Sequence, residues 1–114
     1  MPERRQLKRR HLVYYLRVVN RDTNREVGHV MDVTPEGLLV MSKRRIQVGR
    51  RIKLRMVLPD PLASEQTVEF EGKSLWTGKD VNPDFFDTGF KLSRISRRHL
   101  ATIRTLIKDH GFRD

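Results

Sequence analysis

The stretch Ile52-Lys53-Leu54-Arg55-Met56-Val57-Leu58 decides the fold class of this chain. Apolar side chains occupy positions 52, 54, 56 and 58, and basic side chains occupy positions 53 and 55 between them. Because successive side chains of a β-strand point to opposite faces, this alternation predicts a strand with one face buried and the other in water. Proline at positions 59 and 61 ends the strand, since proline has no N–H group to donate to a strand ladder.

Strand patterns of the same kind occur on both sides of this stretch. They predict strands at residues 12–19, 27–33, 38–41, 67–76 and 86–92. Within the fourth of these, Gly72 is expected to mark a bulge or a bend. Trp76, at the end of the same strand, is expected in the core, and His29 is expected along the strand at 27–33.

The last apolar pattern, at residues 95–108, has the period of a helix. It places one apolar face at Leu100, Ile103, Leu106 and Ile107. Ser96 stands where an N-cap is expected, and His99 is expected on the helix surface. Six short strands followed by one helix predict a mainly β fold, namely a small six-stranded antiparallel β-barrel with a C-terminal α-helix.

The overall composition limits what such a small protein can do. Its 114 residues suffice for one domain with one modest core. The chain carries 24 Lys and Arg against 14 Asp and Glu, and this net charge of +10 favours phosphate-bearing or other acidic partners. It has no cysteine, which excludes disulfides, thiolate zinc sites and cysteine nucleophiles.

The N-terminal residues differ in character from the rest. Residues 1–11 are strongly basic and lack apolar periodicity, so we expect a flexible basic arm there, followed by a single domain over residues 12–114. No apolar stretch resembles a signal peptide or reaches the roughly 20 residues of a membrane span. These features predict a cytoplasmic protein.

Two short motifs stand out from this background. The first is an arginine pair spaced by three residues, Arg5-Gln6-Leu7-Lys8-Arg9, and the second is Asp32-Val33-Thr34-Pro35-Glu36-Gly37. The spacing of the first recurs in this arginine-rich chain, but only Arg5 and Arg9 lie ahead of the first strand pattern. The second is composed of turn residues, so on its own it also fits an ordinary hairpin turn.

Together the two motifs resemble the signature of PilZ domains, small bacterial β-barrels that bind cyclic di-GMP. The family pattern is RxxxR, then a strand, then (D/N)xSxxG at the end of the next strand, and this chain has Thr34 where serine is usual. The segments Leu75-Trp76 and Asp87-Thr88-Gly89-Phe90 and the basic C-terminal helix extend the resemblance over nearly the whole chain. The resemblance implies a second-messenger receptor and not an enzyme, with cyclic di-GMP as its ligand and no catalytic residue, metal or cofactor.

The resemblance also assigns the site. It implies that the ligand is bound by Arg5, Arg9, Asp32, Thr34 and Gly37, with Arg4 and Arg10 near enough to assist. Arginine suits this ligand because its planar fork donates two hydrogen bonds to the O6 and N7 atoms of guanine, or pairs with phosphate. A carboxylate at position 32 accepts hydrogen bonds from guanine N–H groups, and glycine lets the backbone approach closely. Ligand-induced ordering of the arm is then the expected signal to a downstream protein partner.

Two other functions remain consistent with the sequence. A small basic β-barrel can bind RNA or single-stranded DNA, although the aromatic residues, 7% of the chain, are not interleaved with basic residues as stacking surfaces require. A PilZ fold that has lost its ligand can serve as a protein adaptor, although the arginine pair argues against this. Salt dependence separates nucleic-acid binding from a dinucleotide receptor, because contacts with many phosphates weaken steeply as salt is added.

Overall fold

The computed structural model describes residues 16–58 and 67–109 of the chain. This part contains six strands and one helix: β1 (Arg17–Asn20), β2 (Glu26–Val33), β3 (Gly37–Ser42), β4 (Arg51–Val57), β5 (Thr67–Lys79), β6 (Phe86–Ser93) and α2 (Arg97–Asp109). The predicted arm at residues 1–11, the first residues of the strand predicted at 12–19 and the prolines after β4 lie outside the described residues.

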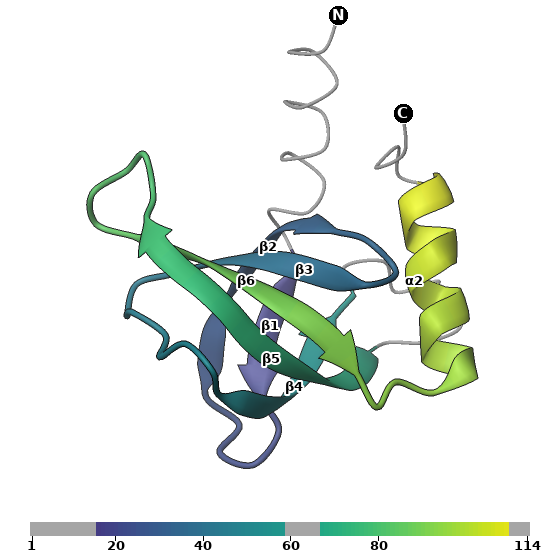
Figure 1. The fold of residues 1–114 in the computed structure, drawn as a ribbon. Coiled ribbons are helices and arrows are strands. Elements are labelled where there is room, and N and C mark those ends of the chain that lie inside the picture. The colour runs from purple at the N-terminus through teal and green to yellow at the C-terminus, as the bar shows by residue number, and fades with distance from the viewer. Residues whose placement is uncertain (1–15, 59–66, 110–114) are drawn as a thin grey trace, which may run out of the picture.

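The six strands form one closed barrel (Figure 1). Their order around it is β1-β2-β3-β6-β5-β4, and β4 pairs with β1, so that all neighbours are antiparallel. Closure gives each described strand two partners, which removes the unpaired edges that invite aggregation. The predicted fold class, a six-stranded antiparallel barrel followed by a C-terminal helix, is confirmed.

Apolar side chains that point inward fill the barrel. In β4, Leu54 and Met56 are fully buried, whereas Arg55 between them is only partly buried. Phe70 of β5 is the largest of the fully buried side chains in the described part of the chain. The alternation that predicts this strand from the sequence therefore corresponds to the inner and outer faces of the barrel.

The helix α2 lies against the outside of the barrel, beside β5 (Figure 1). Ser96 caps it as predicted, because the backbone N–H of His99 donates a hydrogen bond to Ser96 Oγ at 3.1 Å. Ile103 and Leu106 of the predicted apolar face join the core. The expectation for His99 is wrong: docking of the helix on β5 buries this residue, and its Nδ1 accepts a hydrogen bond from the backbone N–H of Glu69 at 3.1 Å.

Strand β5 is longer than the sequence predicts, and its irregularity lies elsewhere. It continues through Lys79, and its bulge falls between Ser74 and Trp76, not at Gly72. Because Leu75 is the extra residue, both it and Trp76 face outward, whereas Ser74 is buried. The expectation that Trp76 lies in the core is therefore wrong, and Trp76 is 50% exposed.

Two leucine truncations test this assignment of inner and outer faces. Leu54→Ala leaves a cavity in the core and is expected to lower the free energy of unfolding by about 2–5 kcal/mol. Leu75→Ala removes the same atoms from a half-exposed site and should cost about 1 kcal/mol or less. Urea denaturation of both variants measures the difference, and equal losses would contradict the described register of β4 and β5.

Candidate ligand-binding site

Three of the predicted site residues lie together at the connection between β2 and β3. Asp32 is the penultimate residue of β2, Thr34 begins the turn, and Gly37 is the first residue of β3. The other predicted members, Arg5 and Arg9 with the assisting Arg4 and Arg10, lie outside the described residues. The structure thus describes the part of the predicted site that belongs to the barrel.

The side chain of Thr34 shapes the turn. Its Oγ1 accepts hydrogen bonds from the backbone N–H groups of Glu36, at 3.2 Å, and Gly37, at 3.1 Å. The backbone N–H of Thr34 donates a hydrogen bond to the carbonyl oxygen of Gly37 at 2.8 Å, which closes the turn. The two bonds to Oγ1 require only a hydroxyl group, so threonine makes them as serine does. Because Thr34 is exposed, its extra methyl group does not have to fit into the core.

Gly37 is required by the packing of two neighbouring strands. It pairs with Lys91 of β6, and a Cβ atom built on it would lie 2.5 Å from the carbonyl oxygen of Phe90. Just before it, the carbonyl oxygen of Glu36 accepts a hydrogen bond from the N–H of Leu92 at 2.9 Å. The turn is therefore fixed to β6 by backbone contacts, and a side chain at position 37 would separate β3 from β6.

A bulge in β2 determines where Asp32 points. The register shifts between Val30 and Asp32, so Met31 is an extra residue, and Val30 and Val33 are both buried although they are three positions apart. Asp32 is left on the outer side of the strand, half-buried. Its Oδ1 accepts a hydrogen bond from the N–H of Val33 at 2.9 Å, and its Oδ2 has no partner among the described residues.

Cross-strand pairs lead from Asp32 to the exposed tryptophan. Asp32 pairs with Leu39 of β3, Leu39 pairs with Gly89 of β6, and Gly89 pairs with Trp76 of β5. A Cβ atom on Gly89 would overlap the indole ring, so the indole lies over the backbone of Gly89. Two strand spacings, roughly 10 Å, separate the backbone of Asp32 from that of Gly89, over which the indole lies.

This arrangement suits a purine. A carboxylate accepts hydrogen bonds from the N–H groups of guanine, and an exposed indole offers a face on which a base can stack. The sequence pattern does not indicate that Trp76 is exposed on this surface, because its place depends on the β5 bulge. The one sequence feature that could have indicated it is Gly89, which provides the space for the ring.

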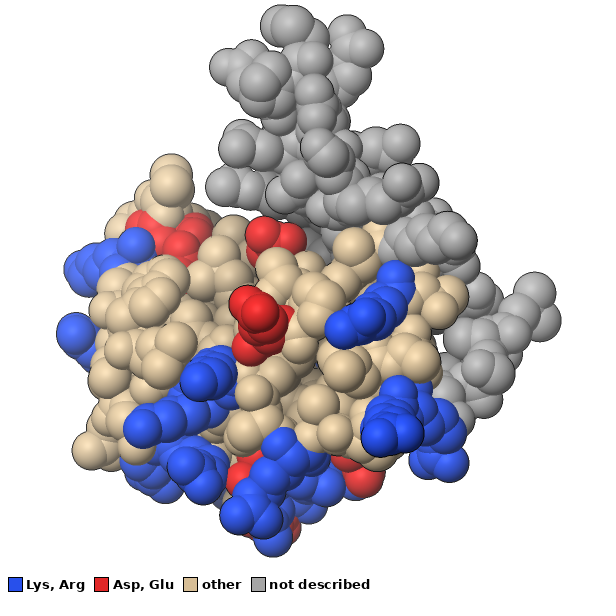
Figure 2. All heavy atoms as spheres, turned by 45° about the vertical axis from the view of Figure 1, so that its right-hand side comes forward, with Lys and Arg blue, Asp and Glu red and all other residues tan. Residues whose placement is uncertain are grey.

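The surface beside the turn is basic. Lys91 pairs with Gly37 on one side and with Lys73 of β5 on the other, and both lysines are exposed. Like charges directly opposite one another on a sheet repel, so the two lysines give this part of the surface a local positive charge. On the face drawn in Figure 2, Lys and Arg side chains lie around a smaller group of Asp and Glu side chains, so positive charge predominates there.

Among residues 16–58 and 67–109, no group of three or more His, Cys, Asp or Glu side chains is placed to hold a metal ion. No helix of the described segments is both long and apolar enough to cross a membrane.

The order of the strands and the helix outside the barrel define the class of the domain: its described part has the fold of PilZ domains. It is similar to the Bacillus subtilis inhibitor of motility (MotI/DgrA), with a TM-score of 0.67 and 15% identity over 82% of this chain and 46% of that protein. It is also similar to the PilZ domain of YcgR from Escherichia coli, solved with c-di-GMP, with a TM-score of 0.60 and 10% identity over 85% of this chain and 82% of that one.

These likenesses confirm the predicted resemblance at the level of the fold. The chain spans about half the length of the Bacillus protein, 46% of it. Comparison of the sequence itself with protein-family models and with curated proteins finds no match. The barrel architecture is thus preserved at a sequence identity of 10–15%.

Two glycine substitutions test the packing at the turn. Gly37→Ala places a methyl group against the backbone of Phe90 and is expected to lower the free energy of unfolding by about 1–3 kcal/mol. Gly78→Ala is the matched control, because a Cβ atom there meets nothing within 4 Å. Urea denaturation compares the two variants, and a Gly37→Ala variant as stable as Gly78→Ala would show that β3 and β6 are not held this closely.

Proposed function

We propose that this chain is a receptor module that binds cyclic di-GMP and signals by ordering its N-terminal arm on the ligand. The observation that carries the proposal is the carboxylate of Asp32, which the β2 bulge presents on the outer surface beside the Thr34 turn. The PilZ fold supports it, because the similar YcgR domain was solved with c-di-GMP.

Each group of the ligand has a partner in this proposal. The Oδ2 atom of Asp32 accepts hydrogen bonds from the N1–H and amino groups of one guanine, and the exposed face of Trp76 stacks on a base. Arg5 and Arg9 donate to guanine O6 and N7 or to the phosphates. Lys91 lies beside the turn, where its ammonium group can neutralise a phosphate.

The signal in this proposal is conformational, and the domain performs no covalent chemistry. Residues 1–11 pay an entropic cost when they are ordered, and the contacts of both arginines with the ligand offset it. The arm then covers part of the barrel, which changes the surface that a downstream protein partner meets. Two of the proposed ligand contacts come from arginines of the arm, and one comes from Asp32 of the barrel. The ligand joins the arm to the barrel, so the arm is ordered only when the ligand is bound.

Removal of either half of the site should abolish tight binding. Arg9→Ala and Asp32→Ala are each expected to weaken cyclic di-GMP binding by about 2–4 kcal/mol, or roughly 30- to 1,000-fold, because each leaves charged hydrogen bonds unmade. Isothermal titration at a low and a high salt concentration measures this. Arg104→Ala, an exposed arginine of α2, is the matched control and should bind like the wild type.

The same titrations can contradict the proposal. Binding that is unaffected by both substitutions would place the ligand elsewhere. If the folded protein gives no heat of binding with cyclic di-GMP, the proposed receptor function is wrong. RNA binding that weakens steeply with salt would then favour the nucleic-acid alternative.

The single tryptophan of the chain provides an independent readout. If a base stacks on Trp76, cyclic di-GMP should change the intrinsic tryptophan emission, and Trp76→Leu should weaken binding by about 1–3 kcal/mol. Leu75→Ala, at the neighbouring exposed position, is the control and should leave the affinity unchanged. Emission that stays constant while titration shows saturable binding would exclude the indole from the site.

A further inference from the structure

A groove runs along the outer surface of β2 and β3, from the ends of these strands that lie away from the Thr34 turn as far as Met31. Two depressions of about 330 Å³ each make it up, and they share His29, Met41 and Phe85. Because the two depressions share these three residues, they adjoin, and we treat them together as one groove. It is not part of the site proposed above, and the inference drawn from it does not depend on cyclic di-GMP.

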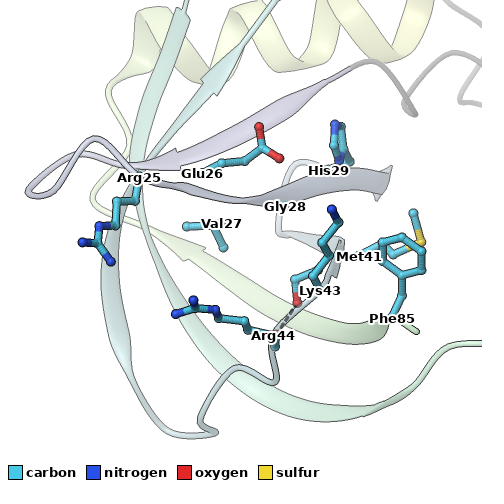
Figure 3. A pocket seen from close by; sticks show the side chains of 10 residues that line it. Arg25, Glu26, Val27, Gly28, His29, Met41, Lys43, Arg44 and Phe85 are labelled. Atoms are coloured by element: carbon cyan, nitrogen blue, oxygen red, sulfur yellow. Dashed lines mark hydrogen bonds between the residues drawn. The ribbon is translucent and has the colours of Figure 1, made fainter. Parts of the chain in front are cut away.

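One end of the groove is basic. Arg25, Lys43 and Arg44 line it, and all three are exposed (Figure 3). The acidic residue at this end, Glu26, has its Oε1 atom 3.5 Å from Arg17 Nη1, so its charge is already balanced. The three cations therefore give this end a net positive charge, which favours an acidic occupant.

The other end is apolar. Met31, Met41 and Phe85 line it and are all partly exposed. The loop between β5 and β6 forms its far wall and adds two polar residues, Asp80 and Asn82, to the lining. In that loop the N–H of Asp80 donates to the carbonyl oxygen of Phe85 at 3.0 Å, which closes the loop on itself. Val81 at its tip is 96% exposed, so a closed loop holds an apolar side chain in water at the edge of the groove.

Backbone contacts fix the floor and the basic end. A Cβ atom on Gly28 would overlap the carbonyl oxygen of Met41, so only glycine keeps β2 this close to β3. Ser42 is buried, and its Oγ donates a hydrogen bond to the carbonyl oxygen of Arg44 at 2.6 Å, which sets the path of the chain that carries Lys43. A groove with a fixed backbone costs little entropy when an occupant binds.

We propose that this groove binds a short acidic peptide segment of a partner protein. Asp or Glu side chains of the segment pair with Arg25, Lys43 and Arg44, and an apolar side chain packs between Met41 and Phe85, against Val81. Methionine-lined surfaces adapt to different apolar anchors. A nucleic acid fits this groove less well, because Phe85 and His29 are the two aromatic rings that line it within the described residues, too few for a run of stacked bases.

The groove and the proposed ligand site are adjacent along the same strands. Met41 is two residues from Leu39, the cross-strand partner of Asp32, and Met31 is the extra residue of the β2 bulge. A partner in the groove therefore contacts the strand segment that also positions the Asp32 carboxylate. This adjacency requires an experiment that distinguishes the two sites.

The proposal can be tested by selecting peptides from a random library displayed on phage against the whole protein. We expect enriched peptides to combine acidic residues with a large apolar residue. In a protein with isotope-labelled methionine methyl groups, the synthesised peptide should shift the NMR signals of Met31 and Met41. Met56, fully buried in the core, should not shift.

Charge reversal and truncation variants locate the peptide. The double variant Lys43→Glu with Arg44→Glu should weaken the affinity for the peptide by about tenfold or more. Arg50→Glu with Arg51→Glu makes the same change of charge on exposed residues outside the groove and should have little effect. Val81→Ser should also lower the affinity for the peptide, whereas Val48→Ser, at a half-exposed position away from the groove, should leave it unchanged.

Three outcomes would overturn the proposal. The first is a selection that enriches no peptide, and the second is an enriched peptide that leaves the Met31 and Met41 signals unchanged. The third is cyclic di-GMP that shifts the same methyl signals and displaces the peptide, because the groove would then belong to the ligand site. Failure of cyclic di-GMP to bind at all would overturn the proposed receptor function and leave this inference standing.

Discussion

The pairing of β1 with β4 is the contact on which the rest of the structure depends. Arg17 pairs with Val57 and Asn20 with Leu54, and this short ladder joins the first strand of the barrel to the fourth. Once the sheet is closed, each strand has a fixed inner face, because buried side chains such as Val18, Leu54 and Met56 must meet in one interior. The side chains that do not point into this interior form the outer surface, and both the Thr34 turn and the groove lie on it.

Two extra residues then decide what this surface displays. The side-chain period of a strand is two, so one additional residue exchanges the faces of everything that follows. In β2 the extra Met31 keeps both Val30 and Val33 inside and leaves Asp32 outside. In β5 the extra Leu75 turns Trp76 away from the core. The carboxylate and the indole are thus exposed by the same device, while the core stays apolar.

The sequence predicts those features that depend on neighbouring residues. Alternation identifies the strand at 52–58, and Ser96 identifies the start of the helix, because both are local patterns. Sequence patterns fail to predict the exposure of Trp76, which depends on a bulge, and the burial of His99, which depends on the docking of the helix. At the site, the motif finds the turn, but the packing of Gly37 against Phe90 depends on which strand lies beside β3. The contributions of Arg5 and Arg9 remain predictions.

The Trp76–Gly89 pair has a consequence for which substitutions the barrel tolerates. The indole occupies the space that a side chain at position 89 would fill, so a substitution at one position affects the other. A variant that gains a larger residue at 89 must displace the ring, and one that loses the ring no longer needs the glycine. The two positions therefore shape this part of the outer surface as a unit, although they stand on different strands.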